Sequence, residues 1–324
     1  MSLSPTQFQT WQGDRYAYEI IEPSRGSPSG APLSPSNGLA LLLIHPIGVG
    51  LSRRFWDRFN LAWAQQVWAR QDGGAIYNLD LLGCGESDLP QRPYKPEDWG
   101  GQLEDFLNQV VQRPVVLVAQ GALVPAAIAL CRLEQEKINA GTSHIKGLVL
   151  SGPPAWRLML DVPATWRKNL VWGLLSSPLG ALFYRYARRR QFLESFSRKQ
   201  LFASNSPIDA EWIEPLVAGA KAPATRHAVF AFLSRFWQQG YGEAVAKIAV
   251  PTLVLFGDEA SSVTRSGNRE SPQDRVDAYV QAFPNAIGQI IPGRNVLPYE
   301  STEAFVAATN QFVKDLPDRS QSLA

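Results

Sequence analysis

The stretch Pro114 to Leu130, PVVLVAQGALVPAAIAL, decides the fold of this 324-residue chain. Val115 to Val118 is a short run of apolar, mostly β-branched residues, which is typical of a parallel strand buried on both faces. From Ala122 onward the chain is rich in alanine, and its apolar residues recur at the spacing of one helix face. Those residues are Leu123, Ala126, Ala127 and Leu130. The stretch therefore predicts a buried strand, a sharp turn and a helix.

A strand, a sharp turn and a helix are the setting of a Gly-x-Ser-x-Gly nucleophile elbow. The five elbow positions here are Ala119-Gln120-Gly121-Ala122-Leu123, so Gly121 stands where the serine would be. No Ser, Thr or Cys lies between Gly100 and Leu130, so no shift of the pattern restores a nucleophile. The turn forces its central residue to a positive φ angle, which strains any residue with a Cβ atom and suits glycine.

Strand patterns alternate with helical patterns on both sides of this stretch. Residues 9–22 predict a β-hairpin that turns at Gly13-Asp14. Further strands are expected at residues 39–44, 75–79, 146–150, 251–256 and 288–291, and helices at 56–70, 99–111, 272–282 and 300–314. Such alternation predicts an α/β fold, with a mostly parallel central sheet flanked by helices.

The alternation is interrupted once, at residues 155–246. This segment has no strand pattern and is rich in Trp, Phe, Tyr, Leu and Arg, so it predicts an inserted helical cap. Residues 1–154 and 247–316 are then the two parts of the core, and residues 317–324 are expected to form a flexible tail. Residues 23–38 are a Pro/Ser/Gly-rich loop.

The composition, with 45% apolar and 19% charged residues, is that of an ordinary globular protein. A net charge of +2 gives no general case for nucleic-acid binding. We expect no cofactor and no metal, because no phosphate loop or metal-ligand spacing occurs. The two distant cysteines, the lack of a signal-peptide pattern and the short apolar runs predict a cytoplasmic protein, with membrane contact as a further option.

Four motifs in a fixed order carry a family resemblance. They are HPIG at His45 to Gly48, DLLGCGES at Asp80 to Ser87, the elbow at Val116 to Ala122, and PTLVLFG at Pro251 to Gly257. Over residues 9–316 the chain resembles the α/β-hydrolase superfamily, in particular its cap-containing esterases and epoxide hydrolases. The resemblance implies that HPIG is the oxyanion loop and that PTLVLFG leads to the catalytic acid.

In this family, serine hydrolysis needs a nucleophile, an acid and a histidine base, in that chain order. The resemblance places the nucleophile at Gly121, the acid at Ala260 and the base at Asn295. All three positions are replaced, so classical serine hydrolysis is not expected. A rearranged site could use His45, His227 or Asp258, although structural or surface roles are favoured for the two histidines.

The resemblance also implies a set of ligand-binding residues. The backbone N–H groups of Ile47 and Ala122 would form the oxyanion hole and could bind a carbonyl or carboxylate. Gln120 lies beside them in the sequence. Arg294 and Asn295 replace the family's Gly-His pair and could act as fixed donors to such a ligand, or they could form an ordinary loop turn.

The cap carries a strongly basic segment. Between Trp166 and Lys199 there are eight Arg or Lys residues and one Glu, interleaved with aromatic and leucine side chains. An amphipathic basic lid can lie on an anionic membrane surface, with Arg188, Arg189 and Arg190 as contacts. Alternatively, the apolar side chains pack on the core and the arginines face solvent.

These observations favour a noncatalytic homologue that binds a lipophilic or carbonyl-bearing small molecule, or a partner. The alternative is a hydrolase or lyase of the superfamily with rearranged catalytic residues. An assembly factor that acts through the charged cap is a third hypothesis.

Overall fold

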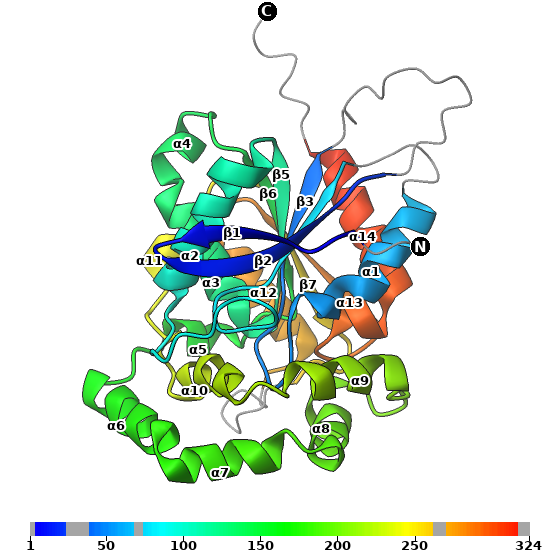
Figure 1. Cartoon of the computed structure of the whole chain (residues 1–324). Helices are drawn as coiled ribbons and strands as arrows, with labels where there is room; N and C mark the ends of the chain where they lie inside the picture. Colours follow the sequence, from blue (N-terminus) through cyan, green and yellow to red (C-terminus); the bar gives the residue numbers. More distant parts are fainter. Residues whose placement is uncertain (1–3, 24–38, 68–73, 262–269, 317–324) are drawn as a thin grey trace, which may run out of the picture.

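The computed structural model describes residues 4–23, 39–67, 74–261 and 270–316. In these residues an eight-stranded sheet runs in the order β1-β2-β4-β3-β5-β6-β7-β8 (Figure 1). The β1–β2 and β2–β4 pairs are antiparallel and all other neighbours are parallel, which confirms the prediction of a mostly parallel sheet. The strands are β1 (Gln7–Trp11), β2 (Asp14–Ile21), β3 (Ala40–Ile44), β4 (Ile76–Leu79), β5 (Val115–Gln120), β6 (Ile145–Ser151), β7 (Thr252–Gly257) and β8 (Ala286–Ile291).

Two apolar clusters cover the two faces of the sheet, because successive side chains of a strand point to opposite faces. Leu42 of β3 and Leu117 of β5 enter the cluster under α2 (Pro96–Phe106), α3 (Val124–Leu133) and α12 (Pro272–Ala282). Leu43 and Val118 enter the cluster under α1 (Asp57–Gln66) and α14 (Thr302–Asp315). The central strands are therefore buried on both faces.

The segment between β6 and β7 contains helices only. They are α5 (Trp156–Leu160), α6 (Thr165–Ser176), α7 (Pro178–Ala187), α8 (Arg190–Phe196), the π-helix η5 (Ser197–Leu201), α9 (Ala210–Gly219), the 3-10 helix η6 (Pro223–Thr225), α10 (Arg226–Leu233) and α11 (Gly242–Val245). Figure 1 shows α6 and α7 at the end of the cap farthest from the sheet. Ala228 and Ala231 of α10 join the core cluster, so α10 connects the cap to the core.

Several helix and strand boundaries differ from the predicted ones, and local capping explains the start of α2. The hairpin turns at Gln12-Gly13, one residue early. α2 starts at Pro96 rather than at residue 99, because proline fits the first helical position and the Asp98 carboxylate accepts from the Lys95 N–H at 2.8 Å. It continues into the π-helix η3 (Leu107–Val111), and the closing helix is preceded by a short turn, α13 (Leu297–Glu300).

The remaining elements are the 3-10 helices η1 (Arg53–Trp56) and η4 (Gly121–Leu123) and the short helix α4 (Gln135–Asn139). Most of the predicted loop at residues 23–38 and the predicted tail at residues 317–324 lie outside the described residues.

Candidate functional site

The candidate site lies where the parallel strands end. Strand pairing sets Ile44 beside Ala119 and Gln120 beside Ser151. The loops after β3, β5, β6, β7 and β8 therefore leave the sheet at one edge, where sites of open α/β sheets lie.

Gly121 adopts the backbone of an elbow. Its φ angle is +62°, β5 ends at the residue before it, and α3 begins at Val124. A Cβ atom built on Gly121 would meet no other atom within 4 Å. The turn therefore keeps open space at the position where the resemblance places a nucleophile, and glycine removes the strain that this φ angle would cause.

The two predicted oxyanion-hole amides lie at equivalent positions after the neighbouring strands β3 and β5. Ile47 and Ala122 each lie three residues beyond the paired residues Ile44 and Ala119. Neither N–H group is among the backbone donors that bond to another described residue. Both amides are thus available as donors to a carbonyl or carboxylate oxygen.

Gln120 and Asn295 come together from distant parts of the chain. The Gln120 side-chain Nε2 donates to the Asn295 carbonyl oxygen at 2.7 Å. This bond fixes the orientation of the amide, and the buried Oε1 atom of Gln120 has no hydrogen-bond partner. The Ser151 hydroxyl, which lies beside Gln120 in the sheet, is also buried without a partner. A buried polar atom without a partner is costly, so these two atoms mark a place for an additional polar group.

The Asn295 side chain is occupied by protein groups. Its Nδ2 donates to the Gln200 carbonyl of the cap at 2.7 Å, and its Oδ1 accepts from the Ser261 N–H at 3.3 Å. Its own backbone N–H donates to the Leu201 carbonyl at 3.0 Å. Ser261 follows Ala260, so the positions that the resemblance assigns to acid and base do lie together. Here they hold the cap against the core.

Arg294 is engaged in the same way. Its Nε donates to the Ser261 hydroxyl at 2.7 Å, and its backbone N–H donates to the Glu300 carboxylate at 2.8 Å. The same carboxylate accepts from the Ala203 N–H of the cap at 2.6 Å. The donors of Arg294 and Asn295 are thus bonded to protein groups, which include the Gln200 and Phe202 carbonyls in the middle of the cap.

The cap also rests directly on the loop after β3, which the resemblance predicts to be the oxyanion loop. A Cβ atom on Gly50 would lie 1.9 Å from the Leu216 carbonyl oxygen of α9, and one on Gly219 would lie 2.4 Å from the Gly50 carbonyl oxygen. Two glycines therefore allow the backbones of loop and cap helix to touch, and α9 covers this side of the site.

His45 has both ring nitrogens in use. Its Nδ1 lies 2.8 Å from the Pro46 carbonyl oxygen, and its Nε2 accepts from the Leu81 N–H at 3.1 Å. Burial lowers the pKa of His45, which keeps the ring neutral, with the proton on Nδ1. The residue ties the oxyanion loop to the loop after β4.

His227 and Asp258 occupy different surroundings. His227 lies on α10, with its ring 6.2 Å from that of Trp172, and burial lowers its pKa. Its Nδ1 atom has no hydrogen-bond partner. Asp258 is exposed and accepts from the Gly293 N–H at 2.9 Å, which joins the loops after β7 and β8.

Sequence reasoning missed an ionic cluster next to the site. Arg53 is 1% exposed, and its guanidinium bonds to the carboxylates of Glu19, Asp80 and Glu86. Asp80 also accepts from the backbone N–H groups of Arg53 and Glu86 at 2.7 and 2.9 Å. We call these four residues the Asp80 network. Asp80 carried a sequence signal through its glycine-rich loop, whereas Arg53 and Glu19 carried none.

Two negative findings concern only the described part of the chain. It contains no group of three His, Cys, Asp or Glu side chains that could hold a metal ion. None of its helices combines the length and apolarity that a membrane crossing requires.

The thiols of Cys84 and Cys131 are buried, and burial raises the pKa of Cys131 to about 12.

Solved structures share this fold over nearly the whole chain. A thermophilic esterase from Thermogutta terrifontis is 17% identical with a TM-score of 0.67, and the match covers 98% of this chain and 99% of that one. A serine hydrolase involved in carbazole degradation is 18% identical with a TM-score of 0.66, over 96% and 98% of the two chains. A bromoperoxidase from Bacillus anthracis is 18% identical with a TM-score of 0.65, over 96% and 100%. These likenesses concern the fold.

The search of curated protein sequences gave no match. The model of the alpha/beta hydrolase family, in contrast, matches residues 41–309, which include the elbow, the helical segment between β6 and β7, and both loops that meet at Asn295. The chain therefore belongs to the α/β-hydrolase family.

Proposed function

We propose that this protein is a noncatalytic member of the α/β-hydrolase family that binds a lipophilic small molecule through a carbonyl or carboxylate group. The observation that carries the proposal is the elbow itself. Gly121 has the φ angle of a nucleophile position and open space beside it, but it presents no side chain that could attack a substrate. The available N–H groups of Ile47 and Ala122 lie at equivalent positions after β3 and β5, at the same edge of the sheet.

The surroundings of the elbow support binding rather than proton transfer. An asparagine amide does not titrate near neutral pH, and the Asn295 side chain is held by Gln200 and Ser261. The unpartnered oxygen of Gln120 can accept from a ligand hydroxyl or amide, and the unpartnered hydroxyl of Ser151 can donate or accept.

The binding test uses cis-parinaric acid, a fluorescent long-chain carboxylate. Gly121→Asn places a side chain in the open space, and asparagine tolerates a positive φ angle. Gly13→Asn is the matched control, because Gly13 has a φ angle of +88° and equally open surroundings in the β1–β2 turn. We expect Gly121→Asn to weaken binding about tenfold or more, and Gly13→Asn to leave it unchanged. Equal binding by all three proteins would place the ligand elsewhere.

The catalytic test is hydrolysis of short- and long-chain p-nitrophenyl esters. We expect no turnover by the native protein above that of buffer. The variant Gly121→Ser/Ala260→Asp/Asn295→His should gain slow turnover if the pocket still admits an ester. Native turnover that the Gly121→Asn change abolishes would refute the noncatalytic proposal.

One observation favours an enzyme with rearranged residues as the second candidate. His227 is a buried, neutral imidazole with one ring nitrogen that has no partner, as a general base requires. The two other substitutes are less suited, because His45 uses both nitrogens and Asp258 bonds to the Gly293 N–H. Native turnover that is lost in His227→Gln would favour this candidate.

A further inference from the structure

The two cap helices α6 and α7 expose several large apolar side chains. We call the following residues of α6 and α7 the outer cap face: Trp166, Leu170, Leu174, Leu179, Leu182 and Phe183. The exposed fractions of Trp166, Leu170 and Leu179 are 62%, 65% and 67%. No residue of α6 is buried. Single exposed leucines are ordinary, whereas a contiguous set on two neighbouring helices indicates an interaction surface.

The opposite side of these helices anchors them to the cap. Tyr184 of α7 is buried against Phe230 of α10, and its hydroxyl lies 2.7 Å from the Thr225 hydroxyl. Trp172 of α6 packs near His227 and Phe236. Phe183 also lies near this anchor, with its ring 6.4 Å from that of Phe230, whereas Trp166 and the four leucines of the outer cap face are exposed. The expectation that the apolar stripe packs inward therefore holds for only part of it.

The charge of this region determines which partner suits it. From Trp166 to Lys199 there are eight Arg or Lys residues and one Glu, in a chain whose net charge is +2. Two copies of this segment, whose net charge is +7, would repel each other, whereas an anionic surface would be attracted. An amphipathic helix pair with Trp, Leu and Phe side chains among cations is the pattern of helices that lie in a membrane interface.

The structure distinguishes the cations that are free from those that are engaged. Arg190 pairs with Glu214 and Glu194, and Arg188 donates to the Lys221 carbonyl at 3.1 Å. Arg189 and Lys199 are exposed, and no carboxylate of the described residues pairs with either. Of the three arginines that the sequence singled out, Arg189 is thus the one available to a partner.

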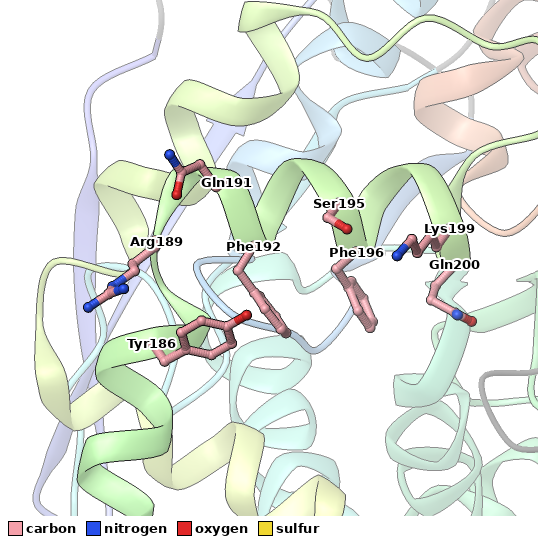
Figure 2. Close-up of a pocket in the computed structure, with 8 residues that line it drawn as sticks. All are labelled: Tyr186, Arg189, Gln191, Phe192, Ser195, Phe196, Lys199 and Gln200. Carbon is pink, nitrogen blue, oxygen red and sulfur yellow. The ribbon is translucent and has the colours of Figure 1, made fainter.

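Arg189 and Lys199 border an aromatic groove of about 360 Å³ (Figure 2). The Tyr186 ring lies 5.3 Å from the Phe192 ring, and Phe192 stacks with Phe196 at 6.1 Å. Figure 2 shows the three rings pointing to the same side of α7 and α8. A groove with an aromatic floor and two cations can hold the phosphate of a lipid headgroup with the adjoining acyl chain.

We propose that the outer cap face is a docking surface for an anionic lipid bilayer, and that the groove between Arg189 and Lys199 receives a lipid phosphate. The leucines and Trp166 enter the acyl boundary, and the free cations meet the negative headgroups. The attachment is peripheral. It brings the cap, whose helix α9 rests on the loop at Gly50, to the membrane surface, where a lipophilic ligand would be dissolved. It does not depend on the proposed ligand site.

The test is flotation of the full-length protein with phosphatidylcholine vesicles that either contain or lack phosphatidylglycerol. We expect binding only to the anionic vesicles, and weaker binding as salt increases. The apolar variant Leu170→Gln/Leu174→Gln/Leu179→Gln/Leu182→Gln should bind about tenfold more weakly or worse. The matched control is Leu61→Gln/Leu133→Gln, which changes exposed leucines outside the cap and should bind normally.

The charge test compares engaged and free cations. Arg189→Gln/Lys199→Gln should weaken binding about fivefold for each charge removed, whereas Arg190→Gln should have a smaller effect. Circular dichroism confirms that each variant is folded. No flotation of the native protein with anionic vesicles, or flotation that none of these variants weakens, would overturn the proposal. A native dimer that the apolar variant converts to a monomer, without any vesicle binding, would assign the face to self-association instead.

Discussion

Two regions near the same edge of the sheet differ in whether their buried polar groups have hydrogen-bond partners. In the Asp80 network, Arg53 is surrounded by three carboxylates, and both Asp80 oxygens accept hydrogen bonds. At the elbow, Gly121 borders open space, and the buried oxygens of Gln120 and Ser151 have no partner. A satisfied network stabilises the fold, whereas unsatisfied groups beside open space suit a ligand. The difference separates residues that stabilise the loops around the site from residues that would contact a ligand there.

The largest expected effect is on the Asp80 network. Arg53→Met leaves the buried Asp80 carboxylate without its cation and Glu19 with Arg54 alone, so the free energy of unfolding should fall by about 3–5 kcal/mol. Urea unfolding measures this. Arg132→Met removes an exposed pair with Glu97 at 3.9 Å and should cost less than about 1 kcal/mol. Similar costs for both changes would show that the network does not stabilise the fold.

The next effect concerns the contact between cap and oxyanion loop. In Gly50→Ala the new Cβ would lie 1.9 Å from the Leu216 carbonyl oxygen, at a φ angle of +78°. Backbone must shift, and the free energy of unfolding should fall by about 2–4 kcal/mol. Limited proteolysis should also cut the cap faster. A fully stable Gly50→Ala would mean that α9 does not rest on this loop.

A smaller cost is expected at the elbow. Gly121→Ala adds a Cβ that meets no atom within 4 Å, so only the strain of the positive φ angle remains, about 1 kcal/mol. Gly13→Ala has the same open surroundings and should cost the same amount in urea unfolding. If Gly121→Ala costs as much as Gly50→Ala, the space beside the elbow is filled and the contrast between the loops is lost.

The smallest effect is a pH dependence. Burial lowers the pKa values of His45 and His227 below 6.5, so the unfolded chain binds more protons as the pH falls through that value. Both histidines therefore reduce stability below about pH 6.5. Asp57 acts in the opposite direction, because burial raises its pKa to about 6 and the folded chain holds that proton more tightly.

The contribution of His227 is isolated by comparing slopes. Between about pH 6.5 and pH 5, His227→Gln should remove part of the acid-induced loss in the free energy of unfolding, because the lowered pKa of the folded His227 no longer contributes. Urea unfolding at several pH values in this range gives the slope of each protein. Identical slopes would show that the His227 ring is as accessible to protons in the folded chain as in the unfolded one.

Local pattern accounts for what could be predicted of the fold and the site. The run Val115 to Val118 and the alanine-rich helix after it predicted β5 and α3, because strand and helix periodicities are properties of neighbouring residues. The position of Gly121 followed from that pattern, and its positive φ angle was expected. The roles of Arg294 and Asn295 could not follow, since their cap partners at residues 200–202 lie more than 90 positions away in the sequence.

The sequence by itself determined the strand and helix alternation, the glycine at the elbow and the charge of the cap, because each of these is local or a matter of residue identity. Only the tertiary structure decided that Asn295 holds the cap, that both nitrogens of His45 are in use, and that part of the apolar residues of α6 and α7 is exposed. An apolar stripe in the sequence indicates that the residues share one face of a helix. Whether that face is buried depends on which other segments of the chain pack against it.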